Sequence, residues 1–202
     1  MLSAEQIIQY QASTDLLDQR IILVTGAGDG IGKAAALACA NVGAKVILAG
    51  RTVAKLEQVY DLITAAGQAE PVLYPIDLEG ATTEDYDQLC VNIIEQFGRL
   101  DGLLHNAGIL GQRTPLSNYR QDVWDRVMQV NLRSVFLTSR AALPYLRAAG
   151  RSAIVNVSSI QGSRGFSGYP GYAATKAGIL GFTRQIAVDY ATAGIVSRVV
   201  AH

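Results

Sequence analysis

The stretch RIILVTGAGDGIG, residues 20–32, joins a short apolar run to a turn that contains four glycines. A continuous apolar run such as RIILV suits a strand buried on both faces, and the alanine-rich segment that follows the turn has the composition of a helix. Tight turns need glycine, a bound pyrophosphate needs backbone that it can approach, and a helix start offers free N–H groups. The order strand, glycine turn, helix therefore predicts dinucleotide binding, with an ordinary glycine-rich loop as the alternative. The predicted binding residues of the turn are Gly26, Gly28, Asp29, Gly30, Ile31 and Gly32.

The rest of the chain repeats this alternation of strand-like and helix-like segments. Further apolar, β-branched runs lie at 44–50, 71–77, 100–108, 152–159 and 194–201. Segments of helical length lie at 30–42, 52–66, 82–97, 122–149 and 172–192. This order predicts an α/β protein of Rossmann-like fold: a doubly wound parallel sheet with helices on both faces. Ligands of such sheets bind at the carboxyl ends of the strands, near the point where strand order reverses.

Composition narrows the class of protein. The 202 residues are 50% hydrophobic and contain no charged or low-complexity block, so we expect a single domain over 1–202. Lys plus Arg and Asp plus Glu number 17 each, which gives no sign of a nucleic-acid or anionic-membrane partner and favours a small molecule. Residues 1–15 lack the features of a signal peptide, and no run of 18 apolar residues occurs. Cys39 and Cys90 are too far apart in sequence to suggest a metal cluster or a disulfide framework, so we expect free thiols in a cytoplasmic protein.

The end of the second strand bears on the choice of cofactor. It reads Gly50-Arg51-Thr52, where an NAD-binding protein usually has an acidic residue for the ribose 2′-hydroxyl. Arg51 cannot accept a hydrogen bond but can pair with a 2′-phosphate, so NADP is favoured and NAD remains possible. Asp29 opposes this prediction, because a nearby carboxylate would repel the phosphate. The alternative for Arg51 is a solvated residue at a helix start.

Tyr172 and Lys176 lie four residues apart in YAATK, which places them on one face of a helix. An ammonium beside a phenol stabilises the phenolate, so the tyrosine could donate and accept a proton near neutral pH. The lysine could also bind a ribose hydroxyl. Ser159, at the end of the fifth apolar run, could hydrogen-bond a substrate carbonyl oxygen, although Ser158 is an equally placed neighbour. An exposed helix pair without function is the alternative for the tyrosine and the lysine.

Four separated motifs resemble the classical short-chain dehydrogenase/reductase family over about residues 18–193. They are TGAGDGIG at 25–32, HNAG at 105–108, Asn131 within QVNLRS, and Ser159 with YAATK at 172–176. The resemblance implies NAD(P)-dependent hydride transfer between an alcohol and a carbonyl, with Tyr172 as acid and base. It implies that Lys176 favours the phenolate and binds ribose, and that Ser159 positions the substrate. It also implies a homodimer or homotetramer formed through 122–149 and 172–192.

The resemblance also gives roles to Asn131 and Asp77. The local sequence alone indicates only a polar helix residue at Asn131 and a loop cap at Asp77. Asn131 would support a water-linked proton relay as a fourth catalytic residue, and Asp77 would hydrogen-bond the adenine. Cofactor binding would extend to Asn106, Ala107 and Gly108.

Within the family, the first part of the chain is similar to the bacterial YciK-like oxidoreductases, whereas SAIVNVSS to VDYA is more similar to ketoacyl-carrier-protein reductases and to sugar and steroid dehydrogenases. Family members usually continue after the sixth strand with a Pro-Gly, a segment that covers the substrate and a seventh strand. The ending GIVSRVVAH therefore predicts a sheet that lacks the last strand. It also leaves open a second function, a catalytically impaired dinucleotide-binding or sensor module.

Overall fold

The computed structural model describes residues 12–201; residues 1–11, on which most of the signal-peptide argument rests, and His202 lie outside the described residues. Six strands form one parallel sheet in the order β3-β2-β1-β4-β5-β6. They are β1 (Ile21–Thr25), β2 (Lys45–Gly50), β3 (Val72–Pro75), β4 (Gly102–His105), β5 (Ser152–Ser158) and β6 (Ile195–Ala201). Strand order reverses between β1 and β4, so the predicted doubly wound sheet is confirmed.

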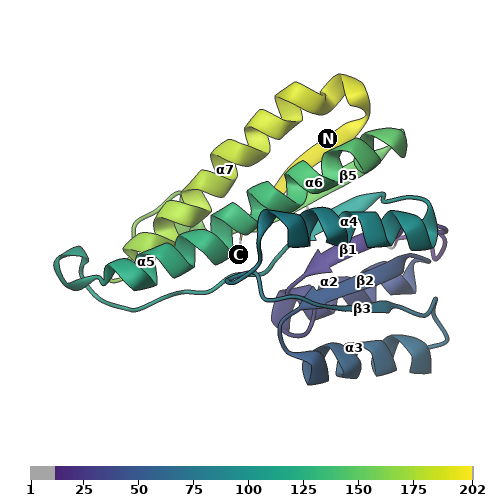
Figure 1. Cartoon of the computed structure of the whole chain (residues 1–202), viewed down its shortest axis with the longest axis horizontal. Helices are drawn as coiled ribbons and strands as arrows, with labels where there is room; N and C mark the ends of the chain where they lie inside the picture. Colours follow the sequence, from purple (N-terminus) through teal and green to yellow (C-terminus); the bar gives the residue numbers. More distant parts are fainter. Residues whose placement is uncertain (1–11, 202) are drawn as a thin grey trace.

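Helices cover both faces of this sheet. On one face α2 (Gly30–Asn41) and α3 (Val53–Ala65) bury an apolar cluster that includes Ala36, Val59 and Val24 of β1. On the other face, α4 (Thr83–Phe97), α6 (Ser134–Ala148) and α7 (Pro170–Tyr190) bury a second cluster, and Figure 1 shows α4 and α6 crossing the near side of the sheet. The central strands are thus enclosed from two sides, which explains why their sequences are apolar without alternation.

The helix expected over 122–149 is not uniform. It consists of α5 (Gln121–Met128), a π-helical segment η2 (Gln129–Arg133) and α6. The N–H of Ser134 bonds the carbonyl of Gln129, five residues earlier, and not the carbonyl four residues earlier. Such an insertion is often found at functional sites, and here it contains Asn131.

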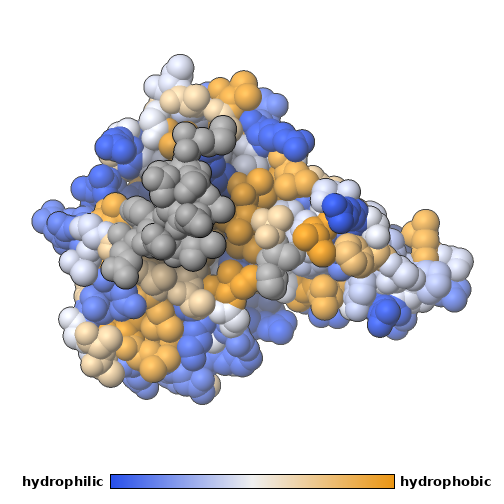
Figure 2. All heavy atoms as spheres, turned by 180° about the vertical axis from the view of Figure 1, so that it is seen from behind, coloured by the Kyte–Doolittle hydropathy of each residue, from blue (hydrophilic) through white to orange (hydrophobic). Residues whose placement is uncertain are grey.

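Three short 3₁₀ helices complete the fold: η1 (Leu116–Asn118), η3 (Ile160–Gly162) and η4 (Ala191–Ala193). In Figure 1, α5 and the first turns of α7 extend away from the sheet, and Figure 2 shows this extension from behind as a narrow projection of mixed hydropathy. Within residues 12–201 no helix is long and apolar enough to cross a membrane. The same residues contain no group of three His, Cys, Asp or Glu side chains that could hold a metal ion.

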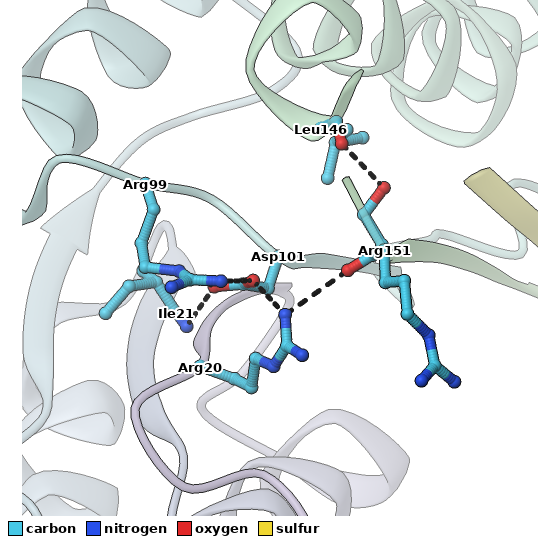
Figure 3. A network of polar contacts seen from close by, with 7 residues as sticks. Arg20, Ile21, Arg99, Asp101, Leu146 and Arg151 are labelled. Carbon is cyan, nitrogen blue, oxygen red and sulfur yellow. Dashed lines mark hydrogen bonds and ion pairs between the residues drawn. The ribbon is translucent and has the colours of Figure 1, made fainter. Parts of the chain in front are cut away.

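A charged network joins the amino ends of β1, β4 and β5, whereas the glycine turn lies at the carboxyl end of β1 (Figure 3). The buried carboxylate of Asp101 accepts hydrogen bonds from Arg20 at 2.7 Å, from both nitrogens that Arg99 presents, and from the backbone N–H of Ile21 at 3.0 Å. Arg20 also donates to the carbonyl of Arg151, just before β5. Burial alone would raise the pKa of Asp101, but the hydrogen bonds outweigh it and lower the pKa.

Candidate functional site

The glycine turn between β1 and α2 is held by tight backbone packing. Gly26 adopts φ 65°, and a Cβ there would lie 2.9 Å from Cα of Ala107. A Cβ on Gly32 would lie 2.1 Å from the carbonyl oxygen of Gly26. The Asn106 amide donates to the carbonyls of Thr25 and Gly26, at 3.3 and 3.2 Å, so this side chain fixes the shape of the turn. Gly26 and Gly32 are therefore required by packing.

The start of α2 offers a place for an anion. Gly30 adopts φ 50°, and apart from its two chain neighbours and the adjoining backbone of α2, no atom of residues 12–201 lies within 4 Å of the position its Cβ would take. Asp29 caps the helix by accepting from the N–H of Gly30 at 2.8 Å. Ile31, which was also predicted to bind cofactor, is partly exposed in the first turn of the helix. Open space, free N–H groups of the first turn and the positive end of the helix dipole together suit a pyrophosphate.

A cavity of about 320 Å³ lies beside this turn, at the carboxyl ends of β1, β2, β3 and β4. Seven residues predicted to bind cofactor line it: Gly26, Gly28, Asp29, Arg51, Asp77, Ala107 and Gly108. The other lining residues were not predicted from the sequence: Gly50, Thr52, Lys55, Leu56, Ile76, Leu78, Ile109 and Val130. The combination of a glycine turn, apolar walls and cationic side chains fits an adenine dinucleotide.

Charges at the cavity differ from expectation in one respect. Nζ of Lys55, in the first turn of α3, lies 2.6 Å from Oδ2 of Asp29. The hydrogen bond from Lys55 lowers the pKa of Asp29, with a further contribution from the N–H of Gly30. Arg51 is exposed and forms no hydrogen bond or ion pair with the residues of the described range 12–201. The carboxylate that was expected to repel a 2′-phosphate is thus already paired with a cation.

The predicted Tyr172–Lys176 pair lies in the first half of α7. The Lys176 side chain is buried, 5.6 Å from the centroid of the Tyr172 ring, and Nζ donates to the carbonyl of Val157 in β5 at 2.6 Å. Burial lowers the pKa of Lys176 to about 8. Tyr172 is only half-buried, so its side chain keeps contact with the surroundings from which a substrate would come.

The two serines after β5 have different contacts. The hydroxyl of Ser158 donates to the carbonyl of Lys176 at 2.9 Å and so joins the strand to α7. The hydroxyl oxygen of Ser159 accepts from the N–H of Gln161 at 3.3 Å and caps η3. Within the described residues the Ser159 hydroxyl donates no hydrogen bond, which leaves its proton for a substrate oxygen. Ser158 is therefore the structural neighbour of the pair.

Asn131 lies fully buried in the π-helical segment and joins three parts of the site. Its Oδ1 accepts from the N–H of Ile109 at 2.8 Å, and its Nδ2 donates to the carbonyl of Ile109 at 2.8 Å and to Oγ1 of Thr175 at 3.2 Å. Next to it, a Cβ on Gly108 would lie 3.4 Å from Oδ1 of Asn131 and 3.7 Å from Nζ of Lys176. The cavity and the Tyr172–Lys176 pair therefore meet at Gly108.

His105, the first residue of HNAG, does not line the cavity. It is buried against α6, where Nε2 lies 3.0 Å from the hydroxyl of Ser139, and burial lowers its pKa to about 4. The neutral ring therefore belongs to the core. Thr25 has a structural role as well, because its Oγ1 accepts from the N–H groups of Asn106 and Ala107. The one sequence signal for these contacts is that His105 and Thr25 each end a buried strand.

Comparison with known proteins places these features in a family. The model of the short chain dehydrogenase family matches residues 20–201. The chain is 42% identical over 183 residues to the uncharacterized oxidoreductase YciK of Escherichia coli, covering 91% of this chain and 73% of that protein. It is 36% identical over 184 residues to a levodione reductase of Leifsonia aquatica, covering 90% and 68%. A short chain dehydrogenase of Shigella flexneri solved in complex with NADP superposes with a TM-score of 0.89 at 39% identity, covering 94% of this chain and 79% of that one.

Proposed function

The chain belongs to the short chain dehydrogenase family, and on that basis we propose that it is an NADP-dependent oxidoreductase that interconverts a small-molecule alcohol and a carbonyl compound. The observation that carries the proposal is the meeting of the dinucleotide cavity and the Tyr172–Lys176 pair at Gly108. A cofactor in the cavity would thereby lie next to a group able to transfer a proton.

Each part of the cofactor has residues to hold it. The turn at Gly28 to Gly30 and the start of α2 would bind the pyrophosphate, and Arg51 the 2′-phosphate. Asp77, at the cavity wall, would hydrogen-bond the adenine, and Lys176 a ribose hydroxyl. When bound, the nicotinamide supplies or accepts the hydride. NAD would bind more weakly, because Arg51 offers no acceptor for a 2′-hydroxyl.

Proton transfer falls to Tyr172. In the direction of reduction its hydroxyl gives a proton to the former carbonyl oxygen, and in oxidation the phenolate takes the proton from the alcohol. The ammonium of Lys176 stabilises the phenolate, and the Ser159 hydroxyl donates to the same substrate oxygen as negative charge develops on it. Asn131 acts through position: its amide holds both backbone groups of Ile109 and contacts α7, and so supports the segment that a proton relay would cross.

Exchange of Tyr172 for Phe tests this assignment. Tyr172→Phe should lower turnover of a reducible carbonyl compound at least 100-fold, because a positioned acid and base contributes about 10²–10⁴. The NADPH dissociation constant should stay within about twofold of wild type, because no phosphate contact changes. Tyr190→Phe, at the end of the same helix, is the matched control and should retain full turnover. Turnover by Tyr172→Phe near the wild-type rate would remove Tyr172 from the mechanism. A folded wild-type chain that binds NADPH but turns over no carbonyl compound would favour a binding or sensor module.

We place the oligomer contact on α5, α6 and α7. Phe136 of α6 and Val188 of α7 are large hydrophobic residues with 48% and 77% of their surface exposed, which supports association through these helices. Light scattering at micromolar concentration should give at least a dimer, and a monomer would contradict this.

The free thiols of Cys39 and Cys90 are consistent with a reducing, cytoplasmic setting.

A further inference from the structure

The ion pair between Lys55 and Asp29 spans the gap between the glycine turn and α3, at the side of the cavity that contains Arg51. We propose that Lys55 is a specificity-determining residue for the 2′-phosphate, which it favours by neutralising Asp29 and by adding a second cation beside Arg51. This inference rests on the proposed function and deepens it, because it assigns cofactor choice to a residue outside the recognised motifs.

The position of Lys55 is fixed by packing, while its charge remains mobile. A Cβ on Gly28 would lie 2.9 Å from Cβ of Lys55, so the base of the side chain lies directly on the glycine turn. The side chain of Lys55 is 51% exposed and that of Asp29 is 74% exposed. Exposed ion pairs contribute little to stability, so the ammonium can turn toward a phosphate oxygen at small cost while it stays beside Asp29.

Charge counting shows why Lys55 matters. With Lys55 present, Asp29, Arg51 and Lys55 together carry one net positive charge; without Lys55 they carry none, and the carboxylate of Asp29 is unpaired. A phosphate monoester carries about −1.5 to −2 charges near neutral pH. Loss of Lys55 therefore removes an attraction and exposes a repulsion, and the resulting loss of affinity should be larger for a ligand that has the 2′-phosphate than for one that lacks it.

Lys33 of α2 provides a matched control. It also lies close enough to lower the pKa of Asp29 by its charge, but it does not line the cavity. Removing either lysine changes the net charge of the protein by one unit. A general electrostatic effect would therefore be seen in both variants, whereas a contact with the phosphate requires Lys55.

The experiment is a calorimetric titration at fixed ionic strength with adenosine 2′,5′-bisphosphate and with 5′-AMP, two probes that lack the nicotinamide. The proteins are wild type, Lys55→Ala, Lys33→Ala and the double variant Asp29→Asn with Lys55→Ala, with thermal melts to confirm that each is folded. Lys55→Ala should weaken the bisphosphate about tenfold and 5′-AMP less than twofold. Lys33→Ala should change both less than threefold, and the double variant should regain part of the loss because the repelling carboxylate is gone.

Two results would count against the inference in different ways. If the wild type binds both probes, and Lys55→Ala lowers the affinity for both equally or for neither, the role of Lys55 is overturned. The proposed function would still stand. Failure of the folded wild type to bind either probe or NADPH would overturn the proposed function, and the role of Lys55 with it.

Discussion

Replacing Gly32 by Ala tests the geometry of the glycine turn most severely. The new Cβ would lie 2.1 Å from the carbonyl oxygen of Gly26 and 2.4 Å from Nδ2 of Asn106, where ordinary contacts are at 3.4 Å or more. The turn must therefore open by more than an ångström, and the Asn106 hydrogen bonds to it must lengthen or break. Overpacking costs about 1–3 kcal/mol and each lost hydrogen bond about 1 kcal/mol, so we expect a loss of about 3 kcal/mol in the free energy of unfolding.

Urea unfolding followed by circular dichroism measures this loss, and NADPH titration should show at least tenfold weaker binding because the start of α2 moves. Gly181→Ala is the control, since Gly181 lies inside α7 with open space around its missing Cβ. That change should stabilise the protein by up to about 1 kcal/mol. A Gly32→Ala protein within about 1 kcal/mol of wild type, with unchanged NADPH binding, would refute the packing argument.

Two further predictions concern acid stability and the serines. As pH falls below about 6.5, His105 takes up a proton in the unfolded chain, whereas the buried ring of the folded protein, with its pKa of about 4, stays neutral. The free energy of unfolding should therefore fall between pH 6.5 and 4. In urea unfolding, His105→Gln should lose less stability than wild type between pH 7 and 4.5, and equal losses would contradict this. Asp101 adds a loss at lower pH, because its pKa is lowered in the folded state and its contribution disappears as the carboxylate is protonated. Ser158→Ala should cost about 1 kcal/mol of stability at unchanged kcat, whereas Ser159→Ala should lower kcat at least tenfold; the opposite pattern would exchange their roles.

Much of the fold could be predicted because local and global signals agree. The apolar runs become strands, of which β1, β2, β4 and β5 are largely buried, whereas β3 is half-buried and β6 mostly exposed. The glycine turn falls between the first strand and the first described helix. The π-helical segment at Gln129–Arg133 could not be predicted, because it does not follow from local composition. The buried amide of Asn131 pairs with the backbone of Ile109, a contact made only once the chain has folded, and residues 122–149 read locally as one amphipathic helix.

The candidate site was predictable to a similar degree. Residue type and spacing indicated Tyr172 with Lys176, and Arg51 at the end of β2. The partner of Asp29 was not predictable, because Lys55 belongs to another helix and reaches the glycine turn only through the packing of α3 beside α2. Asn106 was predicted to bind the cofactor, and the contact of its side-chain amide with the carbonyls of the turn was not foreseen.

The most direct test of the account is titration of the purified chain with NADPH and with NADH, following nicotinamide fluorescence and the melting temperature together. We expect NADPH to bind at least tenfold more tightly than NADH and to raise Tm, because Arg51 and the neutralised Asp29 select the 2′-phosphate. Equal affinity for the two cofactors would contradict the assignment of the 2′-phosphate site, and a folded chain that binds neither would contradict the proposed function as a whole.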